Sequence, residues 1–203
     1  MLSLLSISLL LVAGGPNLAA PPAIGARVAD FTLPGVDGRR YSLSDFKDKK
    51  AFVIVFVGTE CPLANLYLPT LAEMQKKYAG PGVQILTINS NNQDSFAEVV
   101  VHARERQLPF PMLKDAEQKA ADAFGARRTP EAFLLDAGRT IRYRGRIDDQ
   151  YGYTYRRAAP TQTELKDSIE QLLSGKPITT PESEVRGCLI GRGKKEGPTN
   201  PTR

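Results

Sequence analysis

Residues 51–57 form an unbroken apolar run, Ala-Phe-Val-Ile-Val-Phe-Val, that is rich in β-branched side chains. This is the pattern of a strand buried on both faces of a sheet, because a strand with one wet face alternates apolar and polar residues. Residues 83–88 form a second buried run, and the segment between the two has helical apolar spacing. A strand, a helix and a second buried strand form a crossover unit with parallel strands. The sequence therefore predicts an α/β fold.

The segments around this unit complete a mixed sheet with helices on both faces. Two half-buried runs, 31–33 and 40–43, flank a turn and predict an N-terminal β-hairpin. Residues 132–135 and 140–146 predict two strands that their short link makes antiparallel.

Four helices are expected from their apolar spacing and their end residues. They are predicted up to Gly80, after a capping box of Ser95 and Glu98, between Asp115 and Gly125, and from Thr161 and Glu164 onward.

The two ends of the chain differ from its middle. Residues 2–13 are almost all Leu, Ile, Val and Ala with scattered serines, too few to span a bilayer, which needs about 20 apolar residues. They match the apolar part of a secretory signal, with small residues near Ala20 as a cleavage site. A buried N-terminal helix or an uncleaved anchor is the alternative. We predict a signal over 1–20, one domain over 21–175, and a basic, flexible tail over 176–203.

The signal predicts a periplasmic or otherwise exported protein, with no stable membrane span once the signal is removed. Two stretches, residues 139–157 and 186–203, carry more than the whole net charge of +5. Basic patches can bind nucleic acid, but neither stretch has a periodic Lys/Arg face. We therefore expect a solvated surface and no nucleic-acid partner.

Cys61 lies just past the carboxyl end of the first buried strand, and Pro62 suits the first position of a helix. The free N–H groups and the dipole at a helix start stabilise a thiolate, which attacks disulfides and peroxides far faster than a thiol does. The competing interpretation is a small buried core residue. A core cysteine belongs more naturally inside the strand than at its end, so Cys61 is the predicted nucleophile.

With these features the sequence resembles redoxin-domain proteins of the peroxiredoxin-like (AhpC/TSA) group of the thioredoxin superfamily. The resemblance covers roughly residues 25–190. It implies a thioredoxin-like mixed β-sheet flanked by helices, in which Pro69 kinks the helix that follows Cys61. Its landmarks are Asp30-Phe31-Thr32-Leu33, the strand entering Cys61-Pro62, Pro69, Thr129-Pro130, and Tyr143 to Asp149.

The resemblance also implies the other wall of the site. The peptide bond between Thr129 and Pro130 is expected to be cis and to face Cys61, offering backbone groups to an extended substrate. Arg127 and Arg128 directly precede this loop and would bring positive charge to Cys61, unless they form a solvated turn. Thr59 and Pro62 flank the sulfur, so the candidate substrate-binding residues are Thr129, Pro130, Arg128, Pro62 and Thr59.

This chain departs from the family patterns at two points. Cys61 is followed by Pro62, Leu63 and Ala64, so the second cysteine of a Cys-x-x-Cys pair is missing. Peroxiredoxins carry Thr or Ser three residues before the peroxidatic cysteine, where this chain has Gly58. Dithiol chemistry within one loop is excluded, and the usual peroxide-activating hydroxyl is absent.

Cys188 is the second catalytic candidate. It resembles a Gly-Cys element near the end of some peroxiredoxin-like relatives, and the tail is long enough to bring it to Cys61 as a resolving thiol. A static structural disulfide between Cys61 and Cys188 is an alternative, and an unpaired Cys188 is a third. The sequence leaves these three open.

Other motifs give weaker signals. His102 is the sole histidine, and Asn65 stands where a copper-delivery relative has its second cysteine, so no metal site and no cofactor are predicted. Asp148 and Asp149 are expected in a solvated turn. Aromatic and basic residues interleave in the following segment, for which we predict a flexible loop over the site: Tyr151, Tyr153, Tyr155, Arg156 and Arg157.

The predicted function is thiol–disulfide exchange by an exported redoxin through a single active-site cysteine, Cys61. A thiol peroxidase that reduces hydroperoxides is the first alternative, and a non-catalytic binding module with the same fold is the second. The expected partners are protein or small-molecule thiols and disulfides, or hydroperoxides.

Overall fold

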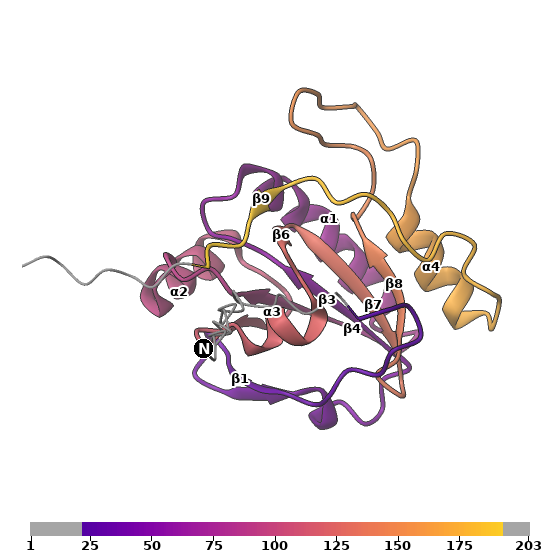
Figure 1. The fold of residues 1–203 in the computed structure, drawn as a ribbon, viewed down its shortest axis with the longest axis horizontal. Coiled ribbons are helices and arrows are strands. Elements are labelled where there is room, and N and C mark those ends of the chain that lie inside the picture. The colour runs from indigo at the N-terminus through magenta and orange to yellow at the C-terminus, as the bar shows by residue number, and fades with distance from the viewer. Residues whose placement is uncertain (1–21, 193–203) are drawn as a thin grey trace, which may run out of the picture.

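The computed structural model describes residues 22–192, and its centre is a five-stranded mixed sheet. Three strands are parallel: β3 (Ala51–Phe56), β4 (Val83–Asn89) and β5 (Met112–Lys114). Strand β7 (Glu131–Asp136) runs antiparallel to β3, and β8 (Ile141–Gly145) runs antiparallel to β7. The order across the sheet is β5-β4-β3-β7-β8. Figure 1 shows strands β3, β4, β7 and β8 at the centre of the molecule. Every residue of β3 is buried, as its apolar run predicted.

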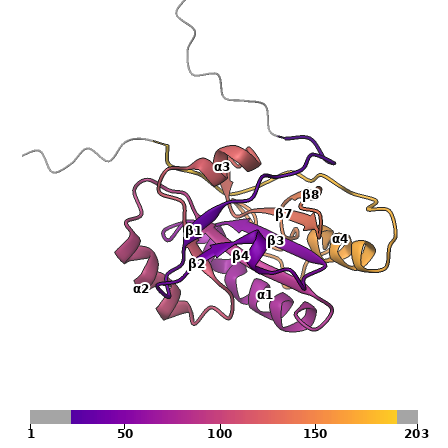
Figure 2. The same cartoon turned by 90° about the horizontal axis from the view of Figure 1, so that it is seen from below.

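Within residues 22–192, four α-helices pack around the sheet. They are α1 (Pro62–Tyr78), α2 (Phe96–Arg106), α3 (Lys119–Phe124) and α4 (Glu164–Leu173). Helices α1 and α4 lie against one face and α3 against the other (Figure 2). Helix α2 adds Val99 and Ala103 to the core layer on the α1 side. This is the predicted mixed sheet with helices on both faces.

Alternation along the strands divides the core into two layers. On β3, Val53 and Val55 belong to the layer of α1 and α4, while Phe52, Ile54 and Phe56 belong to the layer of α3. Neighbouring strands pair with both edges of β3. Because both faces are covered and both edges are paired, the end of β3 is a rigid base for the residues that follow.

The N-terminal hairpin is present. Strand β1 (Thr32–Pro34) pairs antiparallel with β2 (Arg40–Ser42), and the short 3₁₀ helix η1 (Leu43–Asp45) follows. Leu33 and Tyr41 pack against the α3 side of the core. The hairpin prediction is confirmed.

Two helix starts differ from the sequence prediction. Helix α3 begins after Gln118 rather than at Asp115, whose carboxylate instead accepts the N–H of Ala121 at 2.9 Å inside the helix. Helix α4 begins after Thr163, and the Thr161 hydroxyl, which would cap an earlier start, donates to Asp149 instead.

The other predicted helix ends lie close to the observed ones. Helix α1 is capped by Ala79 instead of Gly80. Gly125 closes α3 in the left-handed conformation, which suits a glycine. The capping box of Ser95 and Glu98 at the start of α2 is confirmed.

Past residue 175 the chain packs along the domain, which differs from the expected flexible tail. Strand β9 (Cys188–Leu189) pairs antiparallel with β6 (Arg128–Thr129), and Ile190 is 4 % exposed beside the α3 core. Figure 1 shows this yellow segment crossing the molecule next to β6. The predicted signal over 1–20 and the end of the tail, 193–203, lie outside the described residues. Within 22–192 no helix is long and apolar enough to cross a bilayer.

The basic stretch 139–157 is largely neutralised by neighbouring carboxylates. Five of its arginines form ion pairs that spread over several elements: Arg139 with Asp30, Arg142 with Asp136, Arg144 with Glu182, Arg146 with Glu164, and Arg157 with Asp149.

Candidate active site

Cys61 occupies the N-cap of α1 shortly after β3 ends, and Pro62 is the first helical residue. Proline is favoured there because its missing N–H has no partner at a helix start and its fixed φ suits the helix. Gly58 sits in the turn between strand and cap, where a Cβ would lie 2.5 Å from the Asn91 amide nitrogen. Asp94 accepts from that amide at 3.2 Å, so a hydroxyl side chain of the peroxiredoxin kind at position 58 would have to displace a bonded group.

The Cys61 sulfur is enclosed and has polar neighbours. The residue is 4 % exposed, and its thiol donates a hydrogen bond to the Thr129 carbonyl oxygen at 2.9 Å. Burial acts to raise the pKa of the thiol, but the Thr129 hydroxyl, the N–H groups of Ala64 and Cys188, and the Cys188 thiol together hold that pKa below its ordinary value. Cys61 is thus predisposed to ionise despite its burial.

Strand β6 forms the wall opposite this sulfur. The peptide bond between Thr129 and Pro130 is cis. The backbone N–H groups of Arg127 and Arg128 donate to the Glu131 carboxylate at 2.7 and 2.9 Å. Burial raises the pKa of Glu131, and these two N–H groups oppose that rise. The backbone N–H groups on one side of the segment before Pro130 are therefore hydrogen-bonded within the domain. The other side of β6 pairs with β9.

Cys188 lies on β9 directly opposite Thr129 in the antiparallel register. It is exposed, whereas Cys61 is buried, and both are thiols in this structure. Partial burial of the sulfur and its hydrogen bond to Cys61 raise the pKa of Cys188 to about 11. The structure therefore places two thiols of unlike acidity side by side, although 127 positions separate them in the sequence.

Glycine at position 187 permits the close approach of β9 to β6. A Cβ there would lie 2.0 Å from the Thr129 carbonyl oxygen, which belongs to the backbone and cannot rotate away. Arg128 reaches across the same gap and donates from Nη1 to the Gly187 carbonyl oxygen at 2.7 Å. Its guanidinium thus lies at the residue before Cys188, where its charge acts to lower the Cys188 pKa.

The far end of the tail segment is anchored at Gly191. Its N–H donates to the Asn91 side-chain oxygen at 3.0 Å, and its carbonyl oxygen accepts from the Gln118 side chain at 2.7 Å. Lys114 is buried nearby and donates to the Asn89 side chain and to the Asn91 carbonyl oxygen. We call these hydrogen-bonded residues the polar cradle: Asn89, Asn91, Lys114, Gln118 and Gly191. The cradle connects the end of the sheet to the tail.

The turn before Cys61 is held by two further side chains. The N–H of Thr59 donates to Asp94 at 3.1 Å, and its carbonyl oxygen accepts from Asn65 at 2.8 Å. Asn65 in turn hydrogen-bonds His102 at 2.6 Å, and burial lowers the pKa of that imidazole. Among residues 22–192 no group of three or more His, Cys, Asp or Glu side chains is arranged to hold a metal ion.

Asp148 is buried, in contrast to the solvated turn expected for it and for Asp149, and each is 5 % exposed. Asp148 accepts the Tyr67 hydroxyl at 2.7 Å, and the Tyr67 ring packs edge to face on Tyr151. The carboxylate and the two rings connect helix α1 to the start of the loop 150–160.

Asp149 holds the other side of that loop. Its carboxylate accepts the Thr161 N–H at 2.7 Å and forms an ion pair with Arg157 at 3.2 Å. Both aspartates are therefore anchors for the base of the loop rather than members of a solvated turn.

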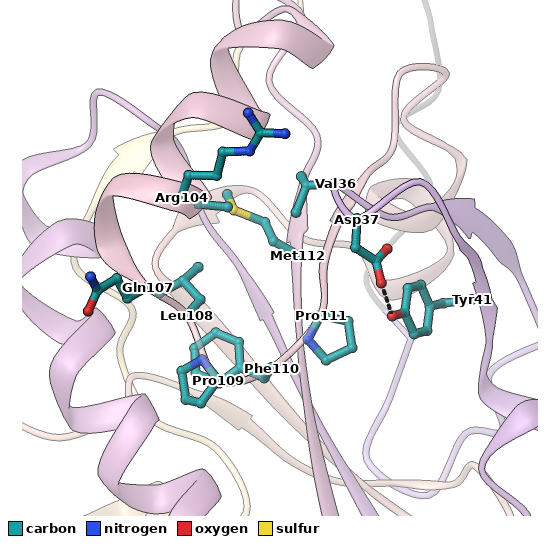
Figure 3. Close-up of a pocket in the computed structure, with 11 residues that line it drawn as sticks. Val36, Asp37, Tyr41, Arg104, Gln107, Leu108, Pro109, Phe110, Pro111 and Met112 are labelled. Carbon is teal, nitrogen blue, oxygen red and sulfur yellow. Dashed lines mark hydrogen bonds between the residues drawn. The ribbon is translucent and has the colours of Figure 1, made fainter.

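A cavity of about 600 Å³ lies elsewhere, between the end of α2 and the hairpin. Figure 3 shows its lining, where the Tyr41 hydroxyl donates to Asp37 at 2.7 Å and Leu108, Phe110 and Met112 supply apolar surface. No candidate site residue lines it, so size alone does not identify the reactive centre.

The structure brings five of the residues singled out in the sequence together at one place: Cys61, Cys188, Thr129, Pro130 and Pro62. It also sets Arg128 beside Cys188. Thr59 contributes its backbone groups to the turn before the sulfur.

Single polar residues in loops and short strands have no periodic signal. Sequence reasoning therefore missed four polar residues of the cradle and the turn: Asn91, Asp94, Lys114 and Gln118. For the pairing of β9 with β6, the available clue was Gly187, because a glycine next to a cysteine permits a close backbone approach.

Comparison with known proteins gives three kinds of match. The model of the AhpC/TSA family matches residues 24–144. The thiol-disulfide oxidoreductase ResA of Geobacillus thermodenitrificans is 31 % identical over 118 residues, a match that spans 56 % of this chain and 64 % of that protein. The chain thus spans less than two thirds of the length of this curated relative.

Solved structures match more of the chain. A hypothetical protein, SMc02350, from Sinorhizobium meliloti has a TM-score of 0.78 and 32 % identity, covering 86 % of this chain and 97 % of that one. A putative thiol:disulfide interchange protein DsbE from Chlorobium tepidum has a TM-score of 0.58 at 20 % identity, covering 75 % of this chain and 96 % of that one. These likenesses show a thioredoxin-like fold.

Proposed function

Because the chain belongs to the AhpC/TSA family, we propose that it is a thiol–disulfide oxidoreductase in which Cys61 is the nucleophile and Cys188 resolves the mixed disulfide. The observation that carries this proposal is the register of β9 on β6, which sets Cys188 opposite Thr129 and so beside the Cys61 sulfur. The name of the ResA relative supports the same class of reaction.

The chemistry begins at Cys61. Its thiolate attacks one sulfur of a partner disulfide, an S–S bond forms between Cys61 and the partner, and the second partner sulfur leaves as a thiolate. Cys188 then loses its proton and attacks the Cys61 sulfur. The Cys61–Cys188 bond forms, and the remaining partner sulfur leaves and is protonated. The partner gains two electrons and two protons, and a dithiol protein or a low-molecular-weight thiol returns them to the enzyme.

The unlike acidities of the two thiols fit these roles. A thiol with a lowered pKa is ionised and ready to attack, and it is also the better leaving group when the internal disulfide is reduced. Cys188, exposed and with a raised pKa, is the sulfur that an external thiol can reach. Thr129 and Pro130 would hold an extended partner chain along β6 once β9 moves aside, with Pro62 fixing the direction of the helix behind the sulfur.

A redox titration is the first test. Reduced protein is equilibrated in glutathione buffers of graded potential, quenched with acid, and mapped by non-reducing peptide mass spectrometry. We expect a Cys61–Cys188 bridge that equilibrates with the buffer. A bridge that resists mild reductant would instead be a structural staple, and no bridge at all would contradict the resolving role of Cys188.

Turnover is then assayed with a disulfide-bonded protein substrate. Cys61→Ser should abolish substrate reduction, while Cys188→Ser should accumulate a mixed disulfide on Cys61. No substrate reduction by the wild type, together with a biological activity that Cys61→Ser leaves intact, would favour the binding-module alternative. Rapid capture of a sulfenic acid at Cys61 by a dimedone-type trap after peroxide treatment would favour the peroxidase, although the glycine at position 58 argues against it.

Location is a separate part of the proposal. The apolar segment within residues 1–20 supports export, and disulfide exchange between proteins is typical of oxidising compartments. Fractionation of cells that express the full chain, with N-terminal sequencing of the mature protein, tests this. Recovery of the intact N-terminus in the cytosolic fraction alone would contradict it.

A further inference from the structure

Tyr153, in the loop that follows β8, is hydrogen-bonded to the tail immediately before Cys188. Its hydroxyl donates to the Gly187 carbonyl oxygen at 2.8 Å and accepts the Gly187 N–H at 2.9 Å. The Tyr153 hydroxyl oxygen also accepts a hydrogen bond from Arg128 Nη1 at 3.0 Å. A tyrosine hydroxyl has one proton and two lone pairs, so all of its hydrogen-bonding capacity is used at this one contact.

The loop that carries Tyr153 is built to hold a fixed position. Asp149 pairs with Arg157 at its base, and the Gly152 N–H donates to the Tyr155 carbonyl oxygen at 3.0 Å across it. The Tyr155 hydroxyl accepts a hydrogen bond from Arg186 of the tail at 2.6 Å. Figure 1 shows this loop in orange, rising from the end of β8 on the side of the molecule where β9 runs.

The contact itself is at the surface. Tyr153 is 63 % exposed and Leu189 is 67 % exposed, whereas Cys61 beneath the tail is 4 % exposed. Hydrogen bonds that compete with water are modest and reversible, so this contact can open without unfolding the domain. When it opens, the edge of β6 and the Cys61 sulfur lose the cover that β9 provides.

We propose that Tyr153 is a positioning residue for thiol–disulfide exchange: it fastens Gly187 so that Cys188 is presented to Cys61, and its release admits a partner chain to Cys61. The inference rests on the proposed function, because it concerns the same two thiols. It assigns a role to the tyrosine- and arginine-rich segment 150–157. The β9 segment then occupies the edge of β6 that an extended partner segment would use, so the partner has to displace it.

The test compares Tyr153→Phe with Tyr151→Phe in the full chain. Tyr153→Phe removes only the hydroxyl that binds Gly187. Tyr151→Phe removes a hydroxyl that has no hydrogen bond to the tail within residues 22–192, while the ring keeps its packing on Tyr67. Both variants are checked for an unchanged thermal unfolding midpoint, which the exposure of Tyr153 leads us to expect.

The first readout is the rate at which iodoacetamide alkylates Cys61 in the reduced protein, followed peptide by peptide. Tyr153→Phe should accelerate alkylation of Cys61 about tenfold, because two hydrogen bonds no longer hold the cover in place. Alkylation of Cys188, already exposed, should change little. Equal Cys61 rates in wild type and Tyr153→Phe would overturn the proposal, as would the same acceleration in Tyr151→Phe.

The second readout is the equilibrium of the Cys61–Cys188 pair with glutathione. Tyr153→Phe should lower the effective concentration of Cys188 at Cys61 by roughly the same tenfold factor, and Tyr151→Phe should leave it unchanged. An unaltered equilibrium in Tyr153→Phe would contradict the positioning role. If wild-type protein forms no bridge, the proposed function fails, whereas the alkylation readout on reduced protein still decides whether Tyr153 fastens the tail.

Discussion

Thr129 and Cys188 are register partners across the two short strands β6 and β9, and the carbonyl oxygen of Thr129 accepts the Cys61 thiol at 2.9 Å. One residue therefore touches both sulfur-bearing residues. The Thr129 hydroxyl is buried and has no hydrogen-bond partner among the described residues, so it is available to stabilise a thiolate on Cys61. Thr129 is thus the point at which the acidity of Cys61 and the placement of Cys188 are coupled.

Replacing Thr129 by valine should raise the pKa of Cys61. The substitution removes the hydroxyl that stabilises the thiolate and keeps the backbone carbonyl and the β6–β9 pairing. The measurement is the pH dependence of Cys61 alkylation in the reduced protein. Thr87→Val is the control, because Thr87 is equally buried on β4 and donates to the Pro111 carbonyl oxygen. An unchanged Cys61 pKa in Thr129→Val, or an equal rise of that pKa in Thr87→Val, would refute the prediction.

Gly187→Ala should loosen the tail, whereas Gly191→Ala should not. The methyl group at 187 would meet the backbone oxygen of Thr129 at 2.0 Å, and overpacking of this kind typically costs about 1 to 3 kcal/mol. At 191 the methyl group would meet the end of the Gln93 side chain, which can rotate away. We expect Cys61 alkylation to rise about tenfold in Gly187→Ala only. Similar rates in the two variants would mean that the approach of β9 to β6 does not control access.

The sequence was sufficient for those parts of the fold that local signals specify. The apolar run 51–57 predicts a buried strand, and a cysteine followed by proline at the end of that strand predicts a helix start with a stabilised thiolate. The strand is present as β3, and Cys61 is the N-cap of α1. Each of these features depends on residues that are neighbours in the sequence. The apolar pattern and the helix-capping residues therefore predict it directly.

The placement of Cys188 is different in kind. Strands β6 and β9 have two residues each, and 59 positions separate Thr129 from Cys188, so no periodic pattern indicates their pairing. The tail is held there by isolated contacts from distant parts of the chain, among them those of Tyr153 with Gly187 and of Asn91 with Gly191. Contacts of this kind depend on the finished fold, which is why the sequence predicted a flexible tail.

Strand β5 was missed for a related reason. It has three residues and ends in a lysine, a residue type that is almost never fully buried unless it is paired. Lys114 is nonetheless 6 % exposed, because the Asn89 side chain and the Asn91 carbonyl oxygen accept its hydrogens. These oxygens come from 25 and 23 positions earlier in the chain, and no local pattern connects them to the lysine.

Lys114→Met should destabilise the domain by about 2 to 4 kcal/mol, because it leaves the Asn89 and Asn91 oxygens without the buried ammonium. Hydrogen bonds to charged groups contribute about 1.5 to 3 kcal/mol each, and burial of the apolar methionine side chain offsets part of the loss of two. Urea unfolding followed by circular dichroism measures the change. Lys119→Met is the control, because its ion pair with Glu117 is exposed and screened by solvent and should contribute little. Equal losses in the two variants would show that the buried lysine has no special role.

Asp149→Asn should lower the free energy of unfolding at neutral pH, and the difference from wild type should shrink in acid. Burial opposes ionisation of this carboxyl, but the Thr161 hydroxyl, the N–H groups of Gln162 and Thr161, and Arg157 outweigh it and lower its pKa to about 2. A folded pKa below the unfolded value of about 3.9 means that the carboxylate stabilises the fold above that value. This stabilisation is lost as the pH falls from about 4 toward about 2.

The measurement is urea unfolding of Asp149→Asn and wild type at neutral pH and at several acidic values. Glu117→Gln is the matched control, because it removes an acid from an exposed ion pair that solvent screens. Since Asp149 also anchors the loop that carries Tyr153, Cys61 alkylation should rise in Asp149→Asn at neutral pH and stay unchanged in Glu117→Gln. A stability difference that is constant across the acidic range would show that the charge of Asp149 is not what holds the loop base.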